Sequence, residues 1–292
     1  SAAVINNDIL FWGGFSYTEP WCYSNGWKLS LNDRQWTWSE LPEFPWKINS
    51  TALCTVGSKI YAMGGSDYNA QAFFTDTDRD GARERLGARL LVLDTTKLQD
   101  GWQELAPCPG TPRWVHTMAA IDRKLYVIGG ATGDTRRDGT NYGYCTVVDN
   151  WQFDTGTEEW TRLPDTPVAS GNFPRNTNNV FRNRYIILPG GYQYSYVLNP
   201  DNTIRESFGE VHSANPKSGL CNDVFVYDVR TATFGTADPL PIDNNLPMTL
   251  IRDDHIYLLG GETGGGVIGG QYYGHHPDLL LIGTISEPNV TP

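Results

Sequence analysis

Two short segments of the sequence place an arginine three residues before a polar side chain. They are Pro112-Arg113-Trp114-Val115-His116 and Pro174-Arg175-Asn176-Thr177-Asn178. Forked guanidinium groups bind carboxylates or sulfates well, and a histidine can act as a general base near neutral pH. This chemistry would make Arg113 and His116 catalytic, and Arg175 and Asn178 substrate-binding. The structural alternative is that the arginines pair with neighbouring elements and that His116 is a hydrogen-bonded strand residue.

A second set of candidates is aromatic and lies just after Gly-Gly pairs. It comprises Tyr144, Tyr192, Tyr194 and Tyr272, with Tyr142, Tyr196 and Tyr273 close by. A tyrosine ring combines an apolar face with one hydroxyl group, and both can contact a sugar ring. We therefore predict substrate-binding roles for the first four. The structural alternative is that these rings pack loops against the sheets.

One acid and three histidines complete the candidate set. Glu262 directly follows a Gly-Gly pair, and we predict that its carboxylate faces the ligand as a catalytic group. His212 is a predicted substrate-binding residue, and His275-His276 are further candidates. For the paired histidines, which precede a proline, the alternative is an ordinary surface loop.

A short acidic segment has the pattern of a calcium loop. Carboxylates alternate along Asp76-Thr77-Asp78-Arg79-Asp80 and are followed by Gly81, as in loops that wrap oxygens around a hard cation. The twelfth position holds Gly87 instead of the glutamate of an EF-hand, so Glu84 would supply the last ligand. The predicted ligands are Asp76, Asp78, Asp80 and Glu84. The alternative is that nearby arginines neutralise the loop without a metal.

The composition excludes several classes of protein. The chain has 22 Lys and Arg against 33 Asp and Glu, a net charge of −11, which argues against binding to nucleic acid. No apolar run approaches the ~20 residues of a membrane-spanning helix, so no membrane partner is expected. Only 19% of the 292 residues are charged while 31 are glycine, and aromatic residues are plentiful. This composition indicates an ordered chain of many short strands and turns rather than a disordered one.

The cysteines and the N-terminus add little about chemistry. Five widely spaced cysteines without a Cys-x-x-Cys pair predict neither a zinc site nor a dense disulfide framework. The chain has no phosphate-binding glycine motif leading into a helix, so no organic cofactor is expected. No signal-peptide pattern is visible, which is compatible with a secreted chain that has lost its signal, and an extracellular or periplasmic location is favoured.

A repeat along the sequence predicts the elements that position these candidates. In each of five units, two apolar runs are joined by a short turn of Asn, Asp, Arg, Gly or Ser residues and end in Gly-Gly. The pairs are Gly13-Gly14, Gly64-Gly65, Gly129-Gly130, Gly190-Gly191 and Gly260-Gly261. A strand-forming residue precedes each pair by three positions. The residues are Leu10, Tyr61, Tyr126, Ile187 and Tyr257.

The second half of the unit also recurs. Three apolar runs end in an aspartate, at Asp94, Asp154 and Asp228. A tryptophan with a leucine three residues later marks the last strand. These pairs are Trp38-Leu41, Trp102-Leu105 and Trp160-Leu163, with Phe234 replacing the tryptophan in the fourth unit. Each unit therefore predicts four antiparallel strands.

At these residues the sequence resembles the Kelch family of β-propellers, whose repeat is ~50 residues. The resemblance implies an all-β, single-domain propeller over residues 1–292, with five or six four-stranded blades that bury each other's faces. The blades are expected at about 1–45, 46–109, 110–167, 168–241 and 242–292. Closure of the ring is open between five blades with one incomplete, a sixth hidden in an insertion, and a chain that is part of a longer protein.

Long insertions follow the second strand of four units, at 66–89, 131–145, 192–220 and 262–277. In a Kelch blade these loops emerge on one face, together with the connectors between blades. Loops on a rigid scaffold are where function concentrates. A binding surface around the central channel is therefore expected.

The segment Ile256-Tyr257-Leu258-Leu259-Gly260-Gly261-Glu262-Thr263-Gly264-Gly265 is similar to the Kelch propellers that act on sialic acid, the N-acetylneuraminate epimerases or mutarotases. This resemblance implies an acidic carbohydrate as the partner. Two alternatives remain: a polysaccharide lyase that cleaves uronic-acid glycans by β-elimination, and a non-catalytic interaction module with a protein partner. A propeller fold supports all three functions.

Overall fold

The computed structural model describes residues 1–16, 18, 20, 22–32, 35–66, 83–133, 144–167, 178–194, 196–198, 204–207 and 219–286. Strands dominate this part of the chain. Its helices are two short 3₁₀ segments, η1 (Arg83–Ala88) and η2 (Leu98–Asp100). Among these residues no helix is long and apolar enough to cross a membrane. The predicted all-β fold class is confirmed.

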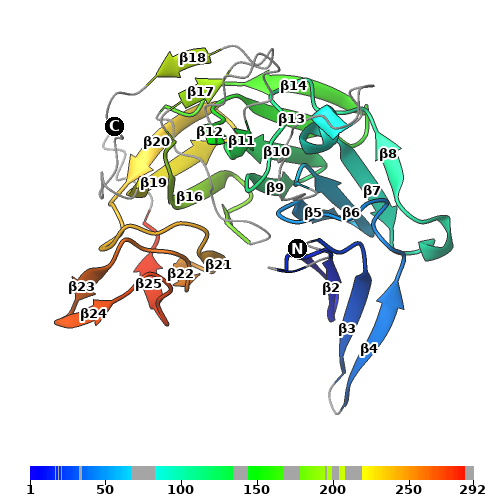
Figure 1. Cartoon of the computed structure of the whole chain (residues 1–292), viewed down its shortest axis with the longest axis horizontal. Coiled ribbons are helices and arrows are strands. Elements are labelled where there is room, and N and C mark those ends of the chain that lie inside the picture. Colours follow the sequence, from blue (N-terminus) through cyan, green and yellow to red (C-terminus); the bar gives the residue numbers. More distant parts are fainter. Residues whose placement is uncertain are drawn as a thin grey trace.

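Five antiparallel sheets, numbered here as blades 1 to 5, follow the sequence repeat (Figure 1). Blade 1 contains β1 (Ala2–Ile5), β2 (Asp8–Trp12), β3 (Gly26–Asn32) and β4 (Gln35–Leu41). Blade 2 contains β5 (Ala52–Val56), β6 (Lys59–Met63), β7 (Leu90–Asp94) and β8 (Gln103–Leu105). Blade 3 contains β9 (Thr117–Ile121), β10 (Lys124–Ile128), β13 (Asn150–Asp154) and β14 (Glu159–Leu163).

Blade 4 contains β15 (Val180–Phe181), β16 (Tyr185–Tyr192), β19 (Leu220–Asp228) and β20 (Thr233–Ala237). Blade 5 has three strands among the described residues, β21 (Met248–Arg252), β22 (His255–Leu259) and β25 (Leu280–Thr284). In every blade neighbouring strands pair in sequence order, as in a meander, so the Gly-Gly pair always follows the second strand or lies at its end.

The insertions form additional sheets. β11 (Ala131–Gly133) and β12 (Tyr144–Thr146) come from blade 3, whereas β17 (Tyr196–Leu198) and β18 (Ile204–Ser207) come from blade 4. All four share one sheet, because Thr146 of β12 pairs in parallel with Val197 of β17. The insertion of blade 5 forms a hairpin of β23 (Gly266–Ile268) and β24 (Gln271–Tyr273). The insertions of blades 3 and 4 are therefore joined.

The hydrophobic core lies between blades rather than within any one of them. One cluster joins blades 1 and 2 through residues such as Leu10 and Leu91, and the next joins blades 2 and 3 through Tyr61 and Leu125. Two further clusters join blade 3 to blade 4 and blade 4 to blade 5. A four-stranded sheet has two apolar faces, so stacking the blades side by side buries both.

Blades 1 and 5 lie at the two ends of the arc in Figure 1, and no core cluster of the described residues joins them. Each presents an apolar face to solvent. On blade 5 the pairing register aligns Met248, Leu250, Leu259, Leu280 and Ile282 on this face, and all are exposed. On blade 1 the exposed large apolar residues of the strands are Val4, Trp27, Trp36 and Trp38. In blades 2, 3 and 4 both faces contribute to the core clusters.

The aspartate that ends the third strand of blades 2, 3 and 4 fixes the turn that follows it. Asp94 accepts hydrogen bonds from the backbone and hydroxyl of Thr96, and Asp154 accepts one from the backbone of Gly156. Asp228 accepts a backbone bond from Arg230 and a two-point ion pair from Arg184, at 2.6 and 2.9 Å. The bonds from Arg184 lower the pKa of Asp228 from 3.8 to about 2. The recurring aspartate is thus a turn residue.

We expect Asp228→Asn to lower the free energy of unfolding by about 1 kcal/mol near neutral pH, the upper range for a partly exposed pair. Because the pKa of Asp228 is lower in the folded protein, its stabilisation is present above pH 3.8 and is lost as the pH falls through about 2. Urea denaturation of both proteins from about pH 6 down to about pH 2 should show the gap narrowing. Asp94→Asn removes no such two-point pair and should lower the free energy of unfolding by less. A difference between Asp228→Asn and wild type that does not change with pH would contradict the role of the Arg184–Asp228 pair.

Candidate functional site

Arg113 is fully buried at the connector between blades 2 and 3. Its guanidinium donates to the carboxylate of Asp149 at 2.7 Å and to three backbone carbonyls, those of Thr111, Gly129 and Asp149. Burial alone would raise the pKa of Asp149, but the charge of Arg113 and hydrogen bonds from Thr111 and Trp151 lower it. These contacts favour the structural alternative, and a catalytic role for Arg113 stays a prediction. The side chain has a structural role, because its bonds to blade 3 leave it no exposed surface.

His116 is also fully buried, beside the Gly-Gly pairs of blades 2 and 3. A Cβ atom at Gly64 would lie 2.7 Å from its Cε1 atom, and one at Gly130 would lie 2.7 Å from its Cβ atom. Glycine at both positions is what makes room for the imidazole. His116 directly precedes β9 and packs against both glycines, and a catalytic role for His116 stays a prediction.

Several predicted site residues lie outside the described residues. They are Arg175, His212, Asp76, Asp78 and Asp80. Glu84 in η1 and Tyr144 in β12 are described only by their backbone. The calcium loop and the sugar contacts of these residues therefore remain predictions.

Asn178 and Tyr272 are both exposed, and they lie apart in the chain. Asn178 forms a parallel bridge with Leu250, and its side-chain amide donates to the carbonyl of Ile251 at 3.2 Å. It therefore ties the start of blade 4 to blade 5.

Tyr272 lies in β24, where a Cβ atom at Gly265 would approach its hydroxyl oxygen to 2.5 Å. Its hydroxyl therefore lies beside Gly265, just before β23.

Three predicted residues do come together where the second strands of blades 4 and 5 end. The rings of Tyr192 and Tyr194 have centroids 4.7 Å apart at an angle of 44°. Burial raises the pKa of Tyr192, and the negative charge of Glu262 on blade 5 raises it further. The carboxylate of Glu262 accepts a bond from the side-chain amide of Asn245 at 3.3 Å. These four residues are called the Tyr192–Glu262 cluster below.

The same end of blades 4 and 5 contains polar groups that the sequence reasoning missed. Gln193, Asn244 and Asn245 are at most 3% exposed, yet both side-chain polar atoms of Gln193 and the Oδ1 atoms of Asn244 and Asn245 have no hydrogen-bond partner in the described structure. A buried polar group without a partner is costly, so such groups often face water or a ligand. The sequence contains one signal for Asn244 and Asn245, which precede the first strand of blade 5. An Asn or His also precedes the first strand of blades 2, 3 and 4.

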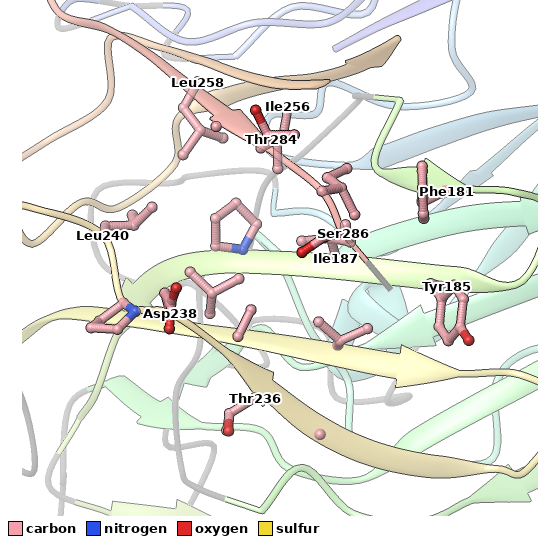
Figure 2. Close-up of a pocket in the computed structure, with 18 of the residues that line it drawn as sticks. Phe181, Tyr185, Ile187, Thr236, Asp238, Leu240, Ile256, Leu258, Thr284 and Ser286 are labelled. Atoms are coloured by element: carbon pink, nitrogen blue, oxygen red, sulfur yellow. The ribbon is translucent and has the colours of Figure 1, made fainter. Parts of the chain in front are cut away.

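A cleft of about 760 Å³ lies between the facing sheets of blades 4 and 5, apart from the Tyr192–Glu262 cluster. Figure 2 shows side chains such as Ile187, Leu240, Ile256 and Leu258 around it. Its described lining is mainly apolar and contains no histidine, lysine or arginine. The lining also includes Tyr185, Asp228 and Asp238, but none of the predicted site residues, which are found instead in the Tyr192–Glu262 cluster and elsewhere.

Comparison with known proteins gives the family. Residues 1–261 match the KLHDC2/KLHL20/DRC7 Kelch-repeats domain. The chain is 26% identical over 238 residues to the Kelch-like protein terF of Aspergillus terreus, covering 78% of this chain and 43% of that protein. It is 28% identical over 169 residues to an N-acetylneuraminate epimerase of Vibrio cholerae, covering 56% of this chain and 35% of that protein. The chain thus spans less than half the length of these relatives.

A solved structure gives the same fold. The structure of YjhT superposes with a TM-score of 0.62 at 13% identity, over 96% of this chain and 79% of that one. This likeness concerns the fold alone, whereas the match over residues 1–261 covers most of the sequence. The chain therefore belongs to the Kelch-repeat family, and its sheets are blades of a Kelch β-propeller.

Proposed function

We propose that the protein acts on an acidic sugar of the sialic-acid type at the Tyr192–Glu262 cluster. The observation that carries the proposal is that one connector links the two blade ends. Asn244 accepts the backbone N–H of Gly191, next to Tyr192, and the amide of Asn245 donates to Glu262. A tyrosine pair beside one carboxylate provides an apolar surface for a sugar ring together with two proton-transferring groups. The similarity to N-acetylneuraminate epimerases supports the choice of sugar.

The chemistry assigned to the cluster is exchange between the anomers of a sugar. Ring opening removes a proton from the anomeric hydroxyl and adds one to the ring oxygen, and reclosure on the other face reverses both transfers. The phenol of Tyr192 is protonated near neutral pH, as any tyrosine with a pKa of 10 or above is, so it is the donor. Glu262 is then the acceptor. The buried amides of Gln193 and Asn244 would bind the sugar hydroxyls.

Glu262→Gln is expected to slow the approach of N-acetylneuraminate anomers to equilibrium by about 10²-fold, the lower range for loss of a general base. Proton NMR of freshly dissolved sugar measures this rate directly. Glu159→Gln, an exposed glutamate of β14, is the matched control and should leave the rate unchanged. Equal rates with wild-type protein and with buffer would overturn the proposal. New ultraviolet absorbance from a uronic-acid glycan would instead identify a lyase.

A further inference from the structure

A second set of side chains surrounds Glu262 and has a different chemistry. One ligand atom each from Glu262, His275 and His276 lies within 4.8 Å of the others. Two imidazoles and one carboxylate form a donor set that suits zinc and other borderline divalent ions. Three protein ligands leave at least one coordination position open for water or another ligand.

The contacts of His275 leave one of its ring nitrogens suitable for a metal. Its Nδ1 atom lies 3.1 Å from the carbonyl oxygen of Thr263, and its own carbonyl accepts the backbone N–H of Thr263 at 2.9 Å. With the proton on Nδ1, the ring donates to this carbonyl and the lone pair of Nε2 points elsewhere. Metal-binding histidines usually donate their other N–H to a carbonyl or carboxylate in this way.

The carboxylate is also held by a hydrogen bond, and the second histidine lies beside the first. The amide of Asn245 donates to Oε2 of Glu262 and thereby orients the carboxylate. The rings of His275 and His276 have centroids 4.4 Å apart. Metal bonds of about 2.0–2.2 Å place neighbouring ligand atoms roughly 3.4 Å apart. Ligand atoms up to 4.8 Å apart must therefore move closer, and exposed histidine side chains can rotate to do so.

The surrounding charge favours a cation. Residues 253–292 contain no lysine or arginine, and the chain carries a net charge of −11. Asp243, which is buried, accepts the backbone N–H of Gly264 through its carboxylate within the same loop region. No described cationic side chain of this segment competes with an ion for Glu262.

We propose that Glu262, His275 and His276 bind one divalent transition-metal ion, with zinc as the reference ion. The site goes beyond the proposed sugar chemistry, although the two share Glu262. They are separable, because metal binding is measured without sugar and the histidine variants leave the Tyr192–Glu262 pair in place. Wild-type protein that binds no zinc but shows normal anomer exchange would overturn this proposal alone.

The test is titration of untagged, metal-stripped protein with Zn²⁺ and with Co²⁺, by calorimetry and by visible absorbance. We expect one ion per chain and a cobalt spectrum without the sulfur charge-transfer band that ligation by one of the five cysteines would give. His275→Gln and His276→Gln should each weaken binding by at least about tenfold.

His255→Gln is the matched control, because His255 is a partly exposed histidine at the opposite end of β22 and contacts Asp254. It should bind zinc as the wild type does. Unchanged affinity in both the His275 and His276 variants, or a cobalt–sulfur band in the wild type, would overturn the site. Circular dichroism of each variant confirms that a lost affinity does not reflect unfolding.

Discussion

Arg113→Met should lower the free energy of unfolding by about 3–5 kcal/mol, because it leaves the carboxylate of Asp149 buried without its counter-charge. The guanidinium is 0% exposed and joins the blade 2–3 connector to Gly129 and Asp149 of blade 3. Methionine fills a similar volume and donates nothing, so three carbonyls lose the bond from Arg113. The carboxylate of Asp149 keeps only the neutral donors Thr111 and Trp151. The loss concerns stability and not substrate binding.

Urea denaturation at neutral pH measures this loss, and a thermal scan should show a midpoint lower by roughly 10 °C. Arg162→Met in the same blade is the control. Arg162 pairs with Asp165 at an exposed position, so the change should cost at most about 1 kcal/mol. Arg113→Met combined with Asp149→Leu should recover part of the stability, because the unpaired charge is gone. An Arg113 variant as stable as the Arg162 variant would contradict the structural role.

The blades were predictable from sequence because each depends on local chemistry. At Gly13, Gly64, Gly129, Gly190 and Gly260 the first glycine of the pair has a φ of 62° to 69°, a conformation that L-residues rarely adopt. The hairpin turns likewise place Asn6, Asp122 and Asp253 at positive φ. Such residues define a turn without help from distant parts of the chain.

The tryptophan that marks the last strand shows that the local sequence does not determine burial. Trp102 is buried against Trp12 and Phe44, and Trp160 packs on Phe153, as an anchoring residue should. Trp38 occupies the same place in the repeat but is 59% exposed, because it lies on the outer face of blade 1. The motif predicts the strand, whereas burial depends on the neighbouring blade.

The candidate site was predictable only as separate residues. Arg113 and Asp149 are 36 positions apart, and nothing in the segment around Arg113 indicates that a carboxylate will meet it. Glu262 and Tyr192 lie at one site only because the connector of Asn244 and Asn245 joins blade 4 to blade 5. The parallel pairing of Thr146 with Val197 likewise joins insertions of two blades, which no repeat pattern encodes.

Gly190→Ala should cost at least about 3 kcal/mol, because two penalties coincide at this position. The φ of Gly190 is +69°, where an L-residue costs about 1–2 kcal/mol. In addition, a Cβ atom would lie 2.0 Å from the carbonyl oxygen of Asn244, which accepts the backbone N–H of Gly191. Relief requires moving the connector that carries Asn244 and Asn245, so the Tyr192–Glu262 cluster should be disrupted as well.

Two other glycines allow the backbone penalty and the steric penalty to be measured separately. Gly57 has a φ of +60° but open space around a Cβ atom, so Gly57→Ala should cost only about 1–2 kcal/mol. Gly235 in β20 has open space and no positive φ, so Gly235→Ala should be neutral or stabilising by about 0.5 kcal/mol. Urea denaturation of the three variants gives the comparison. If Gly190→Ala cost no more than Gly57→Ala, the connector between blades 4 and 5 would be free to move, and Tyr192 and Glu262 would not be held as one site.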